Sequence, residues 1–216
     1  MADTPRDPPI HQPPIRLAVC VSGEGRTLQN LIDRIASRAL RATIVQVVAS
    51  RPRIGAIARA EAAGIPQALA AQGKPGLGEF SASVFAPIRQ RGADLVILGG
   101  FLSLLEIPRE YNHRVINVHP ALLPSFGGRG LHGRKAHEAV LAAGVKVSGC
   151  TVHFANDQYD AGPIIAQHAV PVLETDDPDT LAERVFQAEC QTLPAAIALY
   201  ADGRLRIDGK RVHILP

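Results

Sequence analysis

The chain has 216 residues and a formal net charge of +3, and 46% of its residues are hydrophobic, 20% charged and 4% aromatic. This length suits one sizeable α/β domain with its own core. No apolar run is long enough to span a membrane, and the basic residues are dispersed without interleaved aromatic residues, so neither membrane insertion nor nucleic-acid binding is expected.

The chain begins with a proline-rich stretch, and residues 1–14 are expected to be a disordered leader. This stretch lacks the apolar segment of a secretory signal. Three scattered cysteines without C-x-x-C spacing indicate reduced thiols, and together these features predict a cytoplasmic protein. Residues 15–216 contain no repeat and no linker, and are expected to form a single domain.

The first half of the chain alternates short apolar runs with helical patterns. Strands are predicted at 16–21, 42–50, 94–100 and 115–118, and helices at 27–38, 54–64 and 80–92. In the first helix, Leu28, Leu31, Ile32 and Ile35 form an apolar stripe. This order predicts an α/β fold with a mostly parallel sheet over roughly the first 120 residues, in which Pro87 is expected to break the third helix.

The pattern changes after a further helix predicted at 134–144. Two strands follow at 146–156 and 163–172, and then a long helix, 177–203, begins with an Asp cap and a proline at its first position. Pro194 is expected to kink or divide this helix. Residues 204–215 predict a C-terminal hairpin with an Asp208-Gly209 turn.

The first strand ends in the glycine-rich stretch "SGEGRTLQN", residues 22–30. A glycine turn at a helix start favours an anion, and Arg26 and Thr27 add a cation and a hydroxyl, which suits a phosphate monoester. A dinucleotide would require a glycine at Leu28 and an acidic residue after the second strand, where Arg51 leaves only NADP open. A tight turn without a ligand is the other alternative.

Another polar pair ends the strand at 115–118. Asn117 and His119 are two residues apart, so their side chains are expected to point to the same face, at the carboxyl edge where open parallel sheets bind ligands. An amide donor beside a titrating imidazole suits an oxyanion and a proton transfer. A histidine with a purely structural role is about equally compatible with the sequence.

The segment "TVHFANDQYDAGPII", residues 151–165, brings His153, Asp157 and Asp160 into one strand and turn. Aspartates favour such bends by bonding to their own backbone, which is sufficient reason for their presence. The functional alternative is a carboxylate that orients or charges His119. The eight histidines show no metal-ligand spacing, so no metal site is expected.

With these motifs, the chain resembles the phosphoribosylglycinamide formyltransferase branch of the folate-dependent formyltransferases, over about residues 16–205. The resemblance rests on "SGEGRTLQNLID", "INVHPALLP" and "VHFANDQYDAGPIIAQ". It implies a Rossmann-like twisted sheet, mostly parallel and flanked by helices, with a C-terminal hairpin. It also implies that the amine of glycinamide ribonucleotide attacks the formyl carbon of 10-formyltetrahydrofolate, in purine biosynthesis, without a metal.

The same resemblance assigns roles by position. Asn117 would hold the formyl oxygen, His119 would donate a proton or stabilise the oxyanion, and Asp160 would set the protonation of His119. Glu189 would lie at the substrate amine. The ribonucleotide phosphate would be held by the glycine loop, namely Gly23, Glu24, Gly25, Arg26 and Thr27. The folate would contact Phe101, Leu102, Ser103, Leu104, Leu105, Asn117, Asn156, Asp157 and Asp160.

Three features depart from the family pattern. Arg26 occupies a loop position often held by Ser or Asn, where an arginine can also pair with a phosphate. Ser103 replaces a family arginine, and the loop "SFGGRG", residues 125–130, is about two residues longer than usual. The longer loop also resembles formyltetrahydrofolate deformylase, which hydrolyses the same donor, but Pro120 and the glycine loop favour transfer. An NADP-binding reductase is a more distant alternative. The expected partners are small molecules, and the protein is expected to be a monomer or homodimer.

Overall fold

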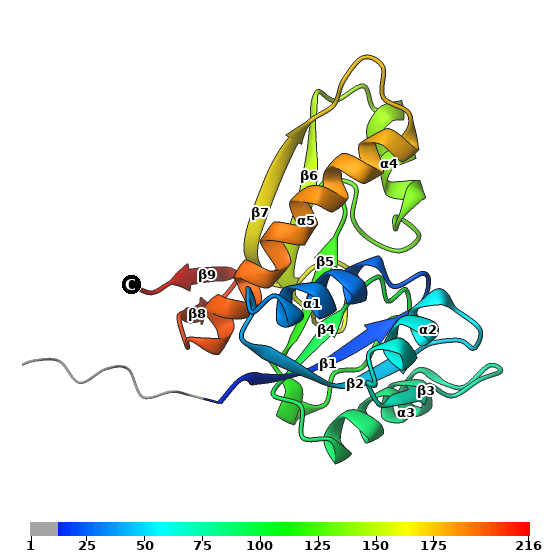
Figure 1. The fold of residues 1–216 in the computed structure, drawn as a ribbon. Coiled ribbons are helices and arrows are strands. Elements are labelled where there is room, and N and C mark those ends of the chain that lie inside the picture. The colour runs from blue at the N-terminus through cyan, green and yellow to red at the C-terminus, as the bar shows by residue number, and fades with distance from the viewer. Residues whose placement is uncertain (1–12) are drawn as a thin grey trace, which may run out of the picture.

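The computed structural model describes residues 13–216, and the predicted leader lies outside the described residues except for positions 13 and 14. Helices flank a nine-stranded sheet of order β3-β2-β1-β4-β5-β6-β7-β9-β8 (Figure 1). The strands are β1 (Ile15–Val21), β2 (Ala42–Ala49), β3 (Gln67–Leu69), β4 (Leu95–Leu98), β5 (Val115–His119), β6 (Val147–Phe154), β7 (Ile164–Pro171), β8 (Leu205–Asp208) and β9 (Arg211–Ile214). The helices are α1 (Arg26–Ala36), α2 (Gly55–Ala62), α3 (Leu77–Gln90), α4 (Arg134–Ala142), α5 (Pro178–Ala201) and the short 3-10 helix η1 (Arg109–Tyr111).

The first five strands in the sheet order pair in parallel, which confirms the predicted α/β architecture. From β1 the chain winds outward to β2 and β3, and then returns to place β4 and β5 on the other side of β1. The carboxyl ends of β1 and β4 therefore flank the point where the winding reverses, where open α/β sheets bind ligands. The strand β3 was not predicted, because its three residues show no buried alternation.

Both faces of the parallel half are covered, because successive residues of β1 enter two different cores. Leu17 and Val19 pack on one side with α1, α2, α4 and α5, whereas Ala18 and Cys20 pack on the other with α3. All four side chains are fully buried. Burying a side chain the size of Leu or Val stabilises the fold by about 1.5–3 kcal/mol. This two-sided burial explains the continuous apolar runs in the sequence.

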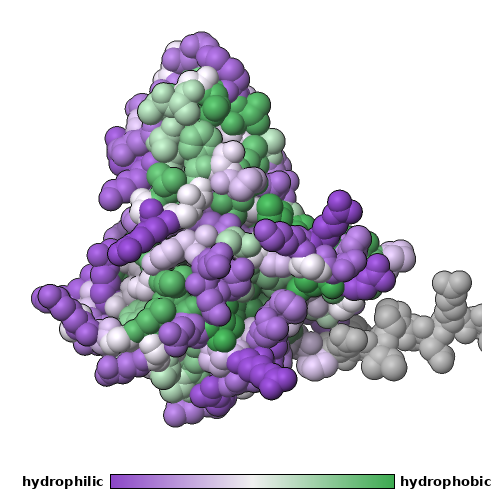
Figure 2. Space-filling model, turned by 180° about the vertical axis from the view of Figure 1, so that it is seen from behind, coloured by the Kyte–Doolittle hydropathy of each residue, from purple (hydrophilic) through white to green (hydrophobic). Residues whose placement is uncertain are grey.

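The second half of the sheet is antiparallel at β6 and β7, which rise as a long twisted ribbon above the parallel part (Figure 1). The helix α5 packs along β6 and β7. Seen from behind, the molecule carries apolar side chains over its upper part (Figure 2). The C-terminal hairpin forms as predicted, but Asp208 pairs with Arg211, so the two loop residues are Gly209 and Lys210.

Neither Pro87 nor Pro194 ends its helix, so the predicted break at Pro87 and the predicted division at Pro194 are wrong. Pro87 lies within α3, and α5 runs through Pro194 to Ala201. A proline has no N–H, so Pro194 leaves the carbonyl of Cys190, four residues earlier, without its helical donor. Arg34 and Asn30 of α1 donate to this carbonyl oxygen, over 3.1 and 3.4 Å, and so compensate for the lost bond. Within residues 13–216, no helix has both the length and the apolar character needed to cross a bilayer.

The Asp177 cap at the start of α5 can be tested by substitution. Asp177 caps the helix by accepting from the backbone N–H groups of Asp179 and Thr180, and Thr180 closes a capping box. We expect Asp177→Ala to lower the free energy of unfolding by about 1 kcal/mol in urea denaturation. Asp177→Asn is the matched control and should stay near the wild type, because Asn also caps helices. Equal losses in both variants would contradict a capping role.

Candidate active site

A cavity of about 510 Å³ opens at the carboxyl ends of β1, β4 and β5. Its walls come from the start of α1, the segment after β4, the end of β5, the loop before α4, the turn after β6 and the second to fourth turns of α5. The predicted residues that line it are Arg26, Thr27, Phe101, Leu102, Ser103, Leu104, Leu105, Asn117, His119, Asn156, Asp160 and Glu189. One cavity thus brings together residues far apart in the sequence.

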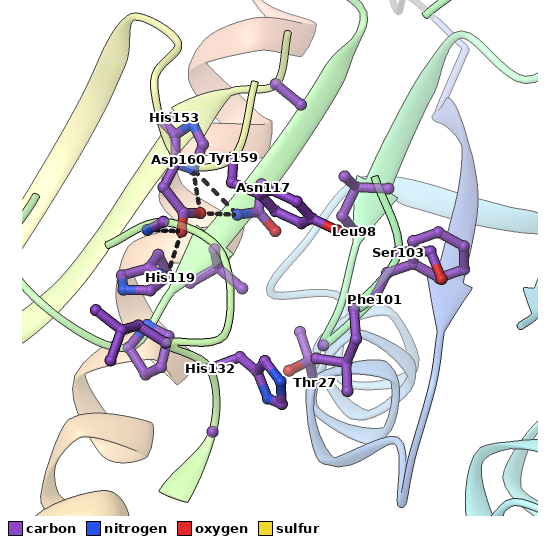
Figure 3. A pocket seen from close by; sticks show the side chains of 18 of the residues that line it. Thr27, Leu98, Phe101, Ser103, Asn117, His119, His132, His153, Tyr159 and Asp160 are labelled. Carbon is purple, nitrogen blue, oxygen red and sulfur yellow. Dashed lines mark hydrogen bonds and ion pairs between the residues drawn. The ribbon is translucent and has the colours of Figure 1, made fainter. Parts of the chain in front are cut away.

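Four polar side chains, namely Asn117, His119, His153 and Asp160, form a connected polar group on one side of this cavity (Figure 3). The Nδ2 of Asn117 lies 3.0 Å from His153 Nε2 and donates to Asp160 Oδ1 over 3.3 Å. The Nδ1 of His153 faces the carbonyl oxygen of Phe154 at 3.0 Å, so it carries the ring proton and leaves Nε2 to accept from Asn117. The neighbours thus orient the Asn117 amide and engage both of its N–H groups.

His119 is almost fully buried, and protein groups face both of its ring nitrogens. Its Nε2 lies 2.8 Å from the carbonyl oxygen of Phe126 and donates to it, while Nδ1 lies 3.4 Å from Asp160 Oδ2. Burial lowers the pKa of His119 below its ordinary value, although Asp160 and the Phe126 carbonyl act in the opposite direction. Because Nδ1 faces Asp160, a proton on this nitrogen would lie between the His119 ring and the Asp160 carboxylate.

Asp160 connects this group to the loop before α4. Its backbone has a positive φ of 54°, and its Oδ2 accepts from the backbone N–H of Gly128 over 2.9 Å. Burial raises the pKa of Asp160, but the facing His153 and His119 rings and the Gly128 N–H favour the charged form and lower it overall. The structure thus provides an ionised carboxylate beside His119, in the arrangement that the sequence suggested.

At the other end of the cavity lies the glycine loop. Gly25 precedes α1 with φ 73°, and a Cβ there would lie 2.6 Å from that of Ala56, so the turn requires glycine. In the described part of the chain no side chain caps α1, and its first turn contains no acidic residue. Arg26 and Thr27 line the cavity, whereas Gly23, Glu24 and Gly25 lie in the turn that precedes them and are not part of its wall.

Glu189 is buried at this same end. Its Oε1 accepts from the Thr27 hydroxyl at 2.5 Å, which joins α5 to the first turn of α1. Burial raises the pKa of Glu189 to about 7, with Thr27 and Arg26 acting in the opposite direction. Glu189 is only 8% exposed, so it is not part of a solvated helix face.

The segment after β4 forms a third wall, and two side chains of the turn after β6 fix it. The Tyr159 hydroxyl accepts from the backbone N–H of Leu104 over 3.1 Å, and Asp157 Oδ1 accepts from that of Ile107 over 3.2 Å. Asp157, which was predicted to contact folate, does not line the cavity, because its side chain is turned toward this wall. Its contribution is to hold the segment in place.

Several cavity residues were not among the predicted site residues. They are His132 and the rest of the loop 128–133, with His137, His153, Tyr159 and Phe186. His132 lies between His119 and Thr27 in Figure 3. His153 gave one signal in the sequence, as an imidazole between the apolar residues Val152 and Phe154 of a predicted strand. The others depend on loop and helix contacts between distant segments, which the sequence pattern does not specify.

The NADP alternative finds no support in this geometry. Leu28, at the position of the third glycine, is fully buried in the core. Arg51, which had left NADP open, donates through Nε to the backbone carbonyl of Ser22 over 2.8 Å. Among residues 13–216, no three or more His, Cys, Asp or Glu side chains are grouped so that they could hold a metal ion.

Residues 15–197 match the model of the formyl transferase family. The chain is 40% identical over 195 residues to the trifunctional purine biosynthetic protein adenosine-3 of Bos taurus, covering 89% of this chain but only 19% of that protein. It is 35% identical over 195 residues to the chloroplastic phosphoribosylglycinamide formyltransferase of Arabidopsis thaliana, covering 88% of this chain and 67% of that one. The chain thus spans about a fifth of its bovine relative.

Solved structures give the same family. Glycinamide ribonucleotide transformylase 1 from Symbiobacterium toebii superposes with a TM-score of 0.87 and 38% identity, covering 94% of each chain. A formyltetrahydrofolate deformylase from Pseudomonas syringae superposes with a TM-score of 0.82 and 26% identity, covering 94% of this chain and 66% of that one. The fold is therefore shared by transfer and hydrolysis enzymes, and the identity is higher to the former.

Glu189 gives a test of the cavity's electrostatics. Because its pKa is raised in the folded state, the native protein binds this proton more tightly than the unfolded chain, and stability falls as pH rises from about 4.5 to above 7. The difference of about 2.5 between the two pKa values corresponds to about 3 kcal/mol. We expect Glu189→Gln to remove this fall in the free energy of unfolding, measured by urea denaturation between pH 5 and 8. Glu61→Gln, at an exposed position of α2, should leave the fall unchanged. An unchanged pH profile in Glu189→Gln would contradict the raised pKa.

Proposed function

The chain belongs to the formyl transferase family. We propose that it transfers the formyl group of 10-formyltetrahydrofolate to the amine of glycinamide ribonucleotide. The observation that carries the proposal is the shared cavity. Asn117, His119 and Asp160 stand at one side of it and the glycine loop with α1 at the other. A formyl donor and a phosphorylated amine could therefore meet within one site.

The polar group supports the chemistry of acyl transfer. The amine nitrogen forms a bond to the formyl carbon, the bond from that carbon to the folate nitrogen breaks, and one proton passes from the amine to the folate nitrogen. An oxyanion develops on the formyl oxygen, and a preorganised N–H donor stabilises it. Asn117 can offer Nδ2 by exchanging its 3.3 Å bond to Asp160, while the shorter contact with His153 keeps the amide in place.

His119 and Asp160 support the proton transfer. With its pKa lowered by burial, the imidazole is neutral near pH 7 and can accept a proton from the attacking amine. The ionised Asp160 then stabilises the imidazolium across the 3.4 Å to Nδ1 until the proton leaves with the folate nitrogen. In the resting site Nε2 carries the ring proton and donates to the Phe126 carbonyl, so it cannot accept a second proton. We propose that the substrate replaces this carbonyl when the site is filled and that the ring proton then lies on Nδ1, facing Asp160, which leaves Nε2 free to accept the proton of the amine.

The acceptor end distinguishes transfer from hydrolysis. Water as the acceptor needs no phosphate subsite, whereas the uncapped start of α1, with Arg26 and Thr27 at the cavity wall, suits an anion. Glu189 lies beside Thr27, where we propose that it meets the amine-bearing part of the substrate. Phe101, Ser103 and Leu105, together with Asn156, offer the apolar and backbone wall proposed for the folate.

The two reactions are separated by a single assay. We expect the purified protein to release tetrahydrofolate from 10-formyltetrahydrofolate only when glycinamide ribonucleotide is added, with the formylated ribonucleotide as the product. Absorbance follows the folate, and mass spectrometry identifies the product. Release of formate at the same rate without the ribonucleotide would overturn the proposal in favour of the deformylase.

The roles of the polar group are tested by substitution. We expect His119→Ala and Asp160→Asn each to lower kcat by a factor of about 10²–10⁴, the usual contribution of a positioned acid or base. His168→Ala and Asp202→Asn change the same residue types at exposed positions and should retain wild-type kcat. Near-normal turnover in His119→Ala and Asp160→Asn, with folding verified by circular dichroism, would rule out these roles.

A further inference from the structure

Two side chains of α5 hold the guanidinium of Arg26. Its Cζ lies 3.8 Å from the centroid of the Phe186 ring, and its Nη2 donates to Glu183 Oε2 over 2.5 Å. Phe186 and Glu183 are three residues apart and so lie on the same face of the helix. An arginine in the first turn of α1 is thus fixed from a different helix.

The two partners differ in their relation to the cavity. Arg26 and Phe186 line it together with Thr27 and Glu189, whereas Glu183 lies outside the wall. The Arg26 and Glu183 side chains are 48% and 52% exposed, so their ion pair is weak. Gln187 Nε2 donates to the second oxygen of Glu183 over 2.7 Å, which keeps this carboxylate in place independently of Arg26.

We propose that Phe186 is a positioning residue, which keeps the Arg26 guanidinium at the cavity wall, and that Glu183 is a resting partner, which Arg26 exchanges for the phosphate of the acceptor. Together they set the preference of the site for a phosphorylated acceptor over an unphosphorylated one. This inference rests on the proposed function, because it assigns the phosphate to the start of α1.

The physical basis is a competition between anions for one cation. A guanidinium forms stronger, bidentate bonds with a phosphate than with a half-exposed carboxylate. Stacking on Phe186 does not neutralise the charge of the Arg26 guanidinium. It limits the rotamers of the Arg26 side chain before the phosphate binds, so less conformational entropy is lost on binding. Phe186 should therefore favour phosphate binding, and Glu183 should oppose it.

The test compares glycinamide ribonucleotide with the unphosphorylated riboside. We expect Phe186→Leu to raise the KM for the ribonucleotide about fivefold, the size of an exposed cation–π contact, with kcat and the KM of the formyl donor unchanged. Phe186→Tyr retains the ring and should match the wild type. Glu183→Gln should lower the KM for the ribonucleotide about twofold to fivefold. Neither Phe186→Leu nor Glu183→Gln should alter the use of the riboside.

The decisive control is the same pair of changes made together with Arg26→Ala. If Phe186 and Glu183 act through Arg26, both effects disappear in that background. A fivefold rise that persists without Arg26 would mean that Phe186 only packs, and would overturn the inference. A raised KM in Glu183→Gln would do the same. These results are distinct from a failure of the proposed function, in which the wild type itself would form no formylated ribonucleotide.

Discussion

The antiparallel register between β5 and β6 determines the geometry of the active site. It places His153 directly opposite Asn117, so that the two side chains meet across the sheet. The turn that follows β6 then returns Asp160 to the same point. This turn is tight, because a Cβ at Gly162 would lie 1.7 Å from the carbonyl oxygen of Phe154. A shift of the register by one residue would point these side chains to the opposite face of the sheet.

A second constraint fixes the other end of the cavity, where α5 meets α1. Pro194 frees the carbonyl of Cys190, and Asn30 and Arg34 donate to it. One turn before Pro194, Glu189 bonds to Thr27. The backbone defect in α5 thus supplies a polar contact that aligns the two helices, and the alignment brings the glycine loop next to a buried carboxyl group.

The local features of this protein could be predicted from its sequence. The parallel strands and their helices follow from apolar periodicity, and Asn117 and His119 were expected on one face because they are two residues apart on a strand. Pro194 does not divide α5, as the sequence alone had allowed, because donors from another helix compensate for the missing N–H. Asp157 was assigned to the cavity from its motif, but the direction of its side chain depends on the backbone of a distant segment, at Ile107.

The two buried carboxyl groups of the cavity have opposite pKa shifts, for reasons that lie in their neighbours. Asp160 has two imidazole rings and a backbone N–H around it, which together outweigh its burial and lower its pKa. Glu189 accepts one bond from a neutral hydroxyl, so burial dominates and raises its pKa to about 7. The two carboxyl groups of one cavity therefore differ in protonation near neutral pH. Negative charge is thereby kept beside His119 and reduced near Arg26, where the start of α1 favours an anionic substrate group.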